Sequence, residues 1–103
     1  MQTFPLFANL TGRPVLVIGG GTVAERKTHA LLDAGAQVHL AAPELTPQLK
    51  LWIEQGKVLL RGQQFEAQWL DDVFLVVAAT DDAAVNQTVS DAAEVRKKLI
   101  NVV

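Results

Sequence analysis

A short apolar run that meets three consecutive glycines most constrains what this chain can fold into. Residues 15–18 are typical of a strand, residues 19–21 of a tight turn, and a helical pattern follows at once. The spacing Gly19-x-Gly21-x-x-Ala24 fits the fingerprint of a dinucleotide pyrophosphate site. Gly19 permits the turn, Gly21 lets the backbone approach a phosphate, and Ala24 allows close helix packing. The free amides and the dipole of a helix N-terminus favour an anion there.

The residues after the glycines complete a strand–helix–strand unit. Thr22 and Glu25 have capping-box spacing, which predicts a helix N-terminus. That helix is predicted over 22–34, with Gly35 just past its end and a second strand over 37–42. The unit has about the 30 residues expected of a dinucleotide-binding βαβ unit. A glycine-rich turn without any nucleotide is the alternative.

The rest of the chain continues the alternation of strands and helices. Thr46-Pro47 begins a helix that Gly56 ends, a short turn is predicted at Trp69-Leu70, and a helix is predicted from Asp82 to about Lys98. Further strands are predicted over 57–61, 73–79 and 99–103. The pattern predicts one α/β domain over residues 1–103, a Rossmann-like doubly wound parallel sheet with strand order 3-2-1-4-5. Its ligand crevice is expected beyond the carboxyl ends of strands 1 and 4.

Three further residues are candidates for touching a cofactor in that crevice. Thr80 stands at the mouth of the fourth strand, opposite the glycines. Pro43 and Glu44 follow the second strand, where an acidic residue commonly holds the ribose hydroxyls. Glu44 is late by two or three residues, so a solvated glutamate is the alternative. No Arg or Lys stands there to receive a 2′-phosphate, which favours NAD over NADP.

The remaining charged residues have ordinary structural readings beside a functional one. Asp81 and Asp82 precede a helix, where acids serve as caps, and a role toward substrate is the alternative. Residues 96–98 are all basic, typical of a helix C-terminus or of a patch for an acidic substrate. His29 and His39 lack metal-ligand spacing, and we predict no metal site.

Composition narrows the class of protein. The 103 residues carry a net charge of −2, which argues against nucleic acid as a partner, and they include no cysteine. No apolar run approaches the roughly 18 residues of a membrane span, and the N-terminus lacks the pattern of a secretory signal. We therefore expect a cytoplasmic location. The last strand, 99–103, ends the chain and suggests a fragment of a longer protein.

Nearly the whole chain resembles the N-terminal domain of the siroheme synthase family, the precorrin-2 dehydrogenase/sirohydrochlorin ferrochelatase module. The most specific match is Gly19-Gly20-Gly21-Thr22-Val23-Ala24-Glu25-Arg26-Lys27, paired with Ala78-Ala79-Thr80-Asp81-Asp82. The opening Phe4-Pro5-Leu6-Phe7, the stretch 89–94 and the closing Asn101-Val102-Val103 extend it.

The resemblance implies NAD-dependent oxidation of precorrin-2 to sirohydrochlorin and insertion of ferrous iron to give siroheme. Its cofactor contacts carry over to Thr22, Val23, Pro43 and Glu44. It implies a tetrapyrrole substrate and a homodimer of the full-length protein. The family's aspartate, proposed as general base and metal-handling group, would stand just past Val103, so no catalytic residue is assigned within the chain. The alternative is a non-catalytic NAD-sensing domain of a larger regulator.

Overall fold

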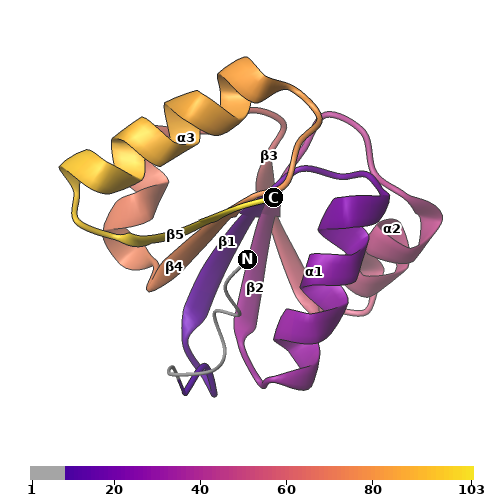
Figure 1. Cartoon of the computed structure of the whole chain (residues 1–103). Coiled ribbons are helices and arrows are strands. Elements are labelled where there is room, and N and C mark those ends of the chain that lie inside the picture. Colours follow the sequence, from indigo (N-terminus) through magenta and orange to yellow (C-terminus); the bar gives the residue numbers. More distant parts are fainter. Residues whose placement is uncertain (1–8) are drawn as a thin grey trace.

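Five parallel strands form one sheet in the order β3-β2-β1-β4-β5 (Figure 1). The computed structural model describes residues 9–103, so the opening motif Phe4–Phe7 lies outside the described residues. The strands are β1 (Pro14–Ile18), β2 (Gln37–Ala41), β3 (Val58–Gly62), β4 (Leu75–Ala78) and β5 (Leu99–Val102). The helices are α1 (Thr22–Asp33), α2 (Pro47–Glu54) and α3 (Ala83–Val95), with a 3₁₀ helix η2 (Ala67–Asp72). The predicted fold class and strand order are confirmed.

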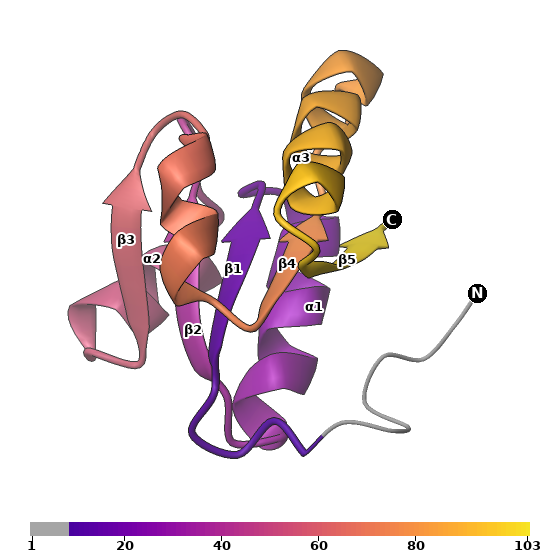
Figure 2. The same cartoon turned by 90° about the vertical axis from the view of Figure 1, so that its left-hand side faces the viewer.

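Helical elements cover both faces of this sheet. Figure 2 shows η2 and α3 in front of the strands and α1 and α2 behind them. The arrangement follows from right-handed crossovers, because α1 and α2 connect strands in one direction and η2 and α3 in the other. All of β4 and residues 15–18 of β1 are buried, which explains why these runs are apolar without alternation.

The ends of α1 and α2 agree only in part with the sequence-based expectations. Gly35, with φ of +82°, ends α1, and Thr46 caps α2 by accepting a hydrogen bond from the Leu49 amide at 3.1 Å. The predicted capping box at Thr22 is wrong. Gly21 is the N-cap, with φ −91° and ψ −163°, and Thr22 is already helical. Since glycine has no side chain to offer, no side chain caps the first turn of α1.

The predicted start of α3 at Asp82 is confirmed, and its predicted end near Lys98 is wrong. The carboxylate of Asp82 caps it by accepting hydrogen bonds from the amides of Ala84 and Val85, at 2.9 and 3.3 Å. The helix ends at Val95, and Lys97 takes the left-handed conformation that closes it, with φ of +55°. The basic residues 96–98 therefore follow the helix instead of forming its last turn. They lie beside the start of β5, at the edge of the sheet opposite the carboxyl ends of the strands.

Thr28 offers a test of the packing under α1. It is fully buried, and its hydroxyl has no hydrogen-bond partner. We expect Thr28→Val to raise the free energy of unfolding by about 1 kcal/mol, because valine keeps the shape and removes the unsatisfied polar group. In a domain of this size the melting temperature should rise by about 4–8 °C. Thr88→Val is the control, since the exposed Thr88 hydroxyl donates to the Ala84 carbonyl at 3.0 Å. An equal gain there, or no gain at Thr28, would refute this interpretation.

Candidate functional site

A cavity of about 940 Å³ opens at the carboxyl ends of β1, β2 and β4, where the sequence places the ligand crevice. Loops that follow four strands contribute to it, together with the first turns of α1 and α3. Its lining is Ile18–Val23, Ala41, Pro43–Thr46, Gln63–Phe65, Ala79–Asp81, Val85, Thr88 and Val103. It therefore brings together all but one of the predicted cofactor residues, the exception being Ala24.

Gly19 lines the cavity directly after β1, between the ends of β2 and β4. Its φ of +136° is a conformation that residues with a Cβ rarely adopt. A Cβ at this position would also collide with the carbonyl group of Ala79, beyond β4. On the other side, the Gly19 amide donates to the Ala41 carbonyl at 3.0 Å. The predicted role of Gly19 in a sharp turn is confirmed, and a close approach to β4 adds to it.

Gly20 is a requirement that the sequence reasoning missed. A Cβ on Gly20 would collide with the carbonyl oxygen of Glu44, and the Gly20 carbonyl accepts a hydrogen bond from the Thr46 amide at 3.0 Å. The turn after β1 is thereby docked against the loop after β2. The fingerprint allows any residue at this position, so only the third consecutive glycine in the sequence signalled the close contact.

Gly21, Thr22 and Val23 form the open side of the turn. All three are exposed and line the cavity, and no atom beyond its chain neighbours lies within 4 Å of a Cβ built on Gly21. None of the described side chains accepts a hydrogen bond from the amides of Thr22 or Val23. Free amides at the N-terminus of a 12-residue helix, beside open space, suit a phosphate group. Ala24 is fully buried and acts from below, where its small side chain lets α1 pack on the sheet.

The loop after β2 supplies the acidic rim of the cavity. Pro43 and Glu44 are exposed and face it, as predicted from their position after the strand. No lysine or arginine is among the described lining residues, whereas Glu44 and Asp81 both line the cavity. A carboxylate accepts hydrogen bonds from ribose hydroxyls and repels a 2′-phosphate. The local charge therefore favours NAD over NADP.

Thr80 forms the wall opposite the glycine turn. Its hydroxyl lies 2.6 Å from Oδ1 of Asn86 and 3.0 Å from the Asp82 carbonyl oxygen, and it accepts a hydrogen bond from the Asp82 amide at 3.1 Å. Its one proton therefore goes to an acceptor within the protein, either Asn86 on α3 or the Asp82 carbonyl. Asp82 is the helix cap and does not line the cavity, whereas Asp81 does.

The sequence analysis missed an apolar wall of the cavity. Phe65, which follows β3, and Val85 on α3 both line the cavity and pack against the core beneath it. The predicted strand order held the signal for Phe65, because the loop after β3 must adjoin the loop after β2. Such a wall suits a flat ring.

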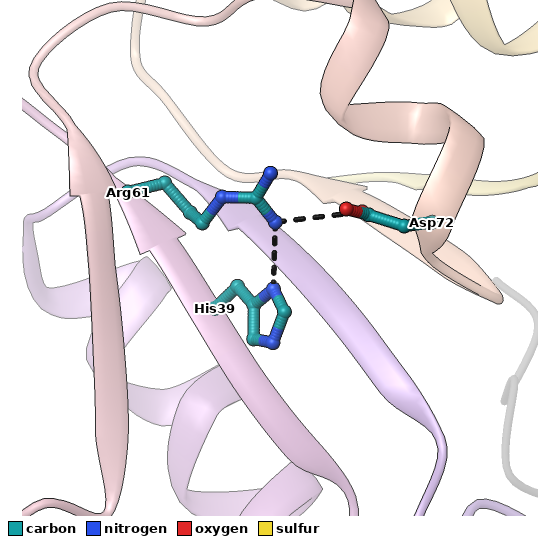
Figure 3. Close-up of polar contacts among 3 residues, drawn as sticks. All are labelled: His39, Arg61 and Asp72. Carbon is teal, nitrogen blue, oxygen red and sulfur yellow. Dashed lines mark hydrogen bonds and ion pairs between the residues drawn. The ribbon is translucent and has the colours of Figure 1, made fainter.

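Outside the cavity, three polar side chains form a small cluster: His39 on β2, Arg61 on β3 and Asp72 on η2 (Figure 3). Nη1 of Arg61 lies 2.9 Å from Nδ1 of His39 and 3.4 Å from Oδ1 of Asp72, and the guanidinium stacks 5.3 Å from the Trp69 ring. Burial, followed by the nearby Arg61 charge, lowers the pKa of His39, and Asp72 partly opposes this. In its neutral form, His39 accepts the hydrogen bond from Arg61.

A pH dependence of stability follows from the lowered pKa of His39. We expect the free energy of unfolding to fall as the pH drops below about 6.5, because the unfolded chain then binds a proton that folded His39 resists. In His39→Gln, the free energy of unfolding, measured with denaturant, should depend less steeply on pH over this range, because the titrating imidazole is gone. Glutamine is chosen because its side-chain oxygen can still accept the hydrogen bond from Arg61. The internal control is the same comparison above about pH 7.5, where His39 is neutral in both the folded and the unfolded chain and the two slopes should agree. Equal slopes below about pH 6.5 for His39→Gln and the unsubstituted chain would contradict the assignment.

The fold and the cavity together define a Rossmann-like dinucleotide-binding domain. The chain belongs to the family described as "Putative NAD(P)-binding", whose model matches residues 6–103. It is 54% identical to the siroheme synthase of Sodalis glossinidius and 48% identical to that of Mannheimia succiniciproducens, in each case over all 103 residues. It spans 22% of the length of each of these relatives.

Solved structures give a matching result. A protein titled SirC, precorrin-2 dehydrogenase, superposes with a TM-score of 0.80 at 34% identity, covering 98% of this chain and 48% of that one. Shikimate dehydrogenase from Aquifex aeolicus has a TM-score of 0.63 at 16% identity, covering 95% of this chain and 45% of that one, which supports the fold alone.

Among the described residues, no helix is long and apolar enough to cross a membrane.

Proposed function

We propose that this chain is the NAD-binding segment of a longer enzyme that oxidises precorrin-2 to sirohydrochlorin in siroheme biosynthesis. The observation that carries the proposal is that one cavity joins the open glycine turn, the acidic rim at Glu44 and the Thr80 loop. The similarity of all 103 residues of this chain to part of the siroheme synthases supports the choice of precorrin-2 as substrate. The proposal that the chain is one segment rests on its covering 22% of those relatives.

The residues present fit NAD. The amides of Thr22 and Val23 would hold the pyrophosphate, with Gly21 leaving room for it. The Glu44 carboxylate would accept hydrogen bonds from ribose hydroxyls, and Phe65 and Val85 would contact a flat ring. When bound, NAD⁺ supplies the hydride acceptor for oxidation of the tetrapyrrole. The protein's contribution would be to orient the cofactor against the substrate.

The fuller proposal includes the second reaction of the module, insertion of ferrous iron into sirohydrochlorin as a lyase. Iron is a substrate in that step. Within residues 9–103, no three His, Asp or Glu side chains gather where a metal ion would need them. We propose that the iron-handling group is the family's aspartate after Val103. A cytoplasmic homodimer of the full-length protein completes this proposal.

A non-catalytic NAD-sensing domain is the second candidate. The open glycine turn and the acidic rim would hold NAD equally well in a domain that binds the cofactor without reacting.

The two functions are separated by one series of measurements. We expect calorimetric titration of the chain to detect NAD⁺ binding tighter than NADP⁺ binding. The enzyme that contains this segment should convert precorrin-2 to sirohydrochlorin with formation of NADH, followed by absorbance. Binding of NAD⁺ without tetrapyrrole turnover would favour the sensor. Failure of both the chain and the longer enzyme to bind NAD⁺ would overturn both functions.

A further inference from the structure

We infer that Asn86 is a positioning residue for the cofactor cavity, an inference that rests on the proposed NAD-binding function. Its carboxamide makes three hydrogen bonds to one residue, Thr80. Oδ1 accepts from the Thr80 amide at 3.3 Å and from the Thr80 hydroxyl at 2.6 Å, and Nδ2 donates to the Thr80 carbonyl at 3.0 Å. Asn86 does not itself line the cavity, whereas Thr80 does.

Asn86 is a firm anchor because of its place in α3. Its amide donates to the Asp82 carbonyl at 3.0 Å, which closes the first turn of the helix. Farther along, Val89 and Ala93 are fully buried against the sheet and hold α3 in position. The side chain therefore ties a loop to a helix that is itself fixed by packing.

The tie extends to the phosphate turn. Thr80 follows Ala79, whose amide donates to the Ile18 carbonyl at 2.8 Å and whose own carbonyl leaves no room for a Cβ on Gly19. Asn86 thus holds Thr80 immediately after a backbone that is already paired with the glycine turn. A wall held in place before binding spares the ligand the entropic cost of ordering it.

The first test measures cofactor affinity. At a temperature where each variant is folded by circular dichroism, Asn86→Ala should bind NAD⁺ about tenfold more weakly, because binding must then order the loop. Gln87→Ala is the matched control, since exposed Gln87 donates to Asp91 on the surface of the same helix, and it should bind like the unsubstituted chain. The double variant Asn86→Ala/Thr80→Val should lose less affinity than the product of the two single losses, because both substitutions remove the hydrogen bond between the Thr80 hydroxyl and Asn86.

The second test needs no ligand. The amides of Thr80 and Asp82 should exchange with solvent about tenfold faster in Asn86→Ala, by nuclear magnetic resonance. Asn86→Asp, which keeps the acceptor and loses the donor, should give an intermediate rate and serves if the alanine variant does not fold. Unchanged exchange, unchanged affinity or fully multiplicative losses in the double variant would overturn the inference. Absence of NAD⁺ binding by the unsubstituted chain would count against the proposed function, and exchange would still decide the role of Asn86.

Discussion

Gly21→Ala is expected to weaken NAD⁺ binding at least about tenfold while leaving the fold and its stability almost unchanged. The backbone at Gly21 has φ of −91° and is accessible to alanine, and a Cβ there meets nothing within 4 Å. The loss of a glycine N-cap and the gain from a less flexible unfolded chain should cancel to within about 1 kcal/mol. In the proposed complex, however, the pyrophosphate would occupy the space that the new methyl group fills.

Calorimetric titration with NAD⁺ and thermal unfolding of the ligand-free protein together check this expectation. Gly12→Ala is a control at an exposed glycine outside the cavity, and it should leave NAD⁺ affinity unchanged. Retention of full affinity by Gly21→Ala would mean that the pyrophosphate binds elsewhere. A large loss of stability would mean that Gly21 serves the fold and not the ligand.

Gly19→Ala is expected to have the opposite profile, with a loss of about 3 kcal/mol in the free energy of unfolding. Two costs add at this position. A φ of +136° is strained for any residue with a Cβ, and the Cβ would collide with the backbone of Ala79, which cannot rotate away as a side chain would. For a domain of this size the loss should lower the melting temperature by about 10–20 °C.

Gly56→Ala separates the two costs. Gly56 also has a positive φ, of +76°, but a Cβ there has open space around it. It should lose about 1 kcal/mol, the cost of the backbone conformation alone. Equal losses at Gly19 and Gly56, measured by denaturant unfolding, would show that the contact with Ala79 contributes nothing.

Much of the fold was predictable because its signals are local. The unbroken apolar runs of β1 and β4 indicate strands covered on both faces, and the right-handed crossover rule then leaves few strand orders. Thr46-Pro47 and Gly35 mark helix ends by their own backbone preferences. The error at Thr22 arose because the capping-box spacing fitted, while the glycine before it took the N-cap position. The predicted end of α3 is wrong because Lys97 adopts a left-handed backbone conformation, which lysine rarely takes and which the sequence pattern therefore does not indicate.

The candidate site divides in the same way. Most of the predicted cofactor residues follow from their place next to strand ends, and these line the cavity: Gly19, Gly21, Thr22, Val23, Pro43, Glu44 and Thr80. Phe65, the role of Asn86 and the need for glycine at position 20 were not predicted, since each depends on how the loops around the cavity are folded.

The amino-acid order alone therefore determined the strand–helix alternation, the parallel sheet and the glycine turn at the end of its first strand, because backbone preferences and the spacing of apolar residues act over a few neighbours. Tertiary structure alone decided that the Glu44 carbonyl leaves no room for a Cβ on Gly20 and that the Ala79 carbonyl leaves none on Gly19. The folded loop before α3 decided that Asn86 binds Thr80. Only packing of the sheet and helices sets how closely the separate loops approach, and the shape of the cavity depends on those distances.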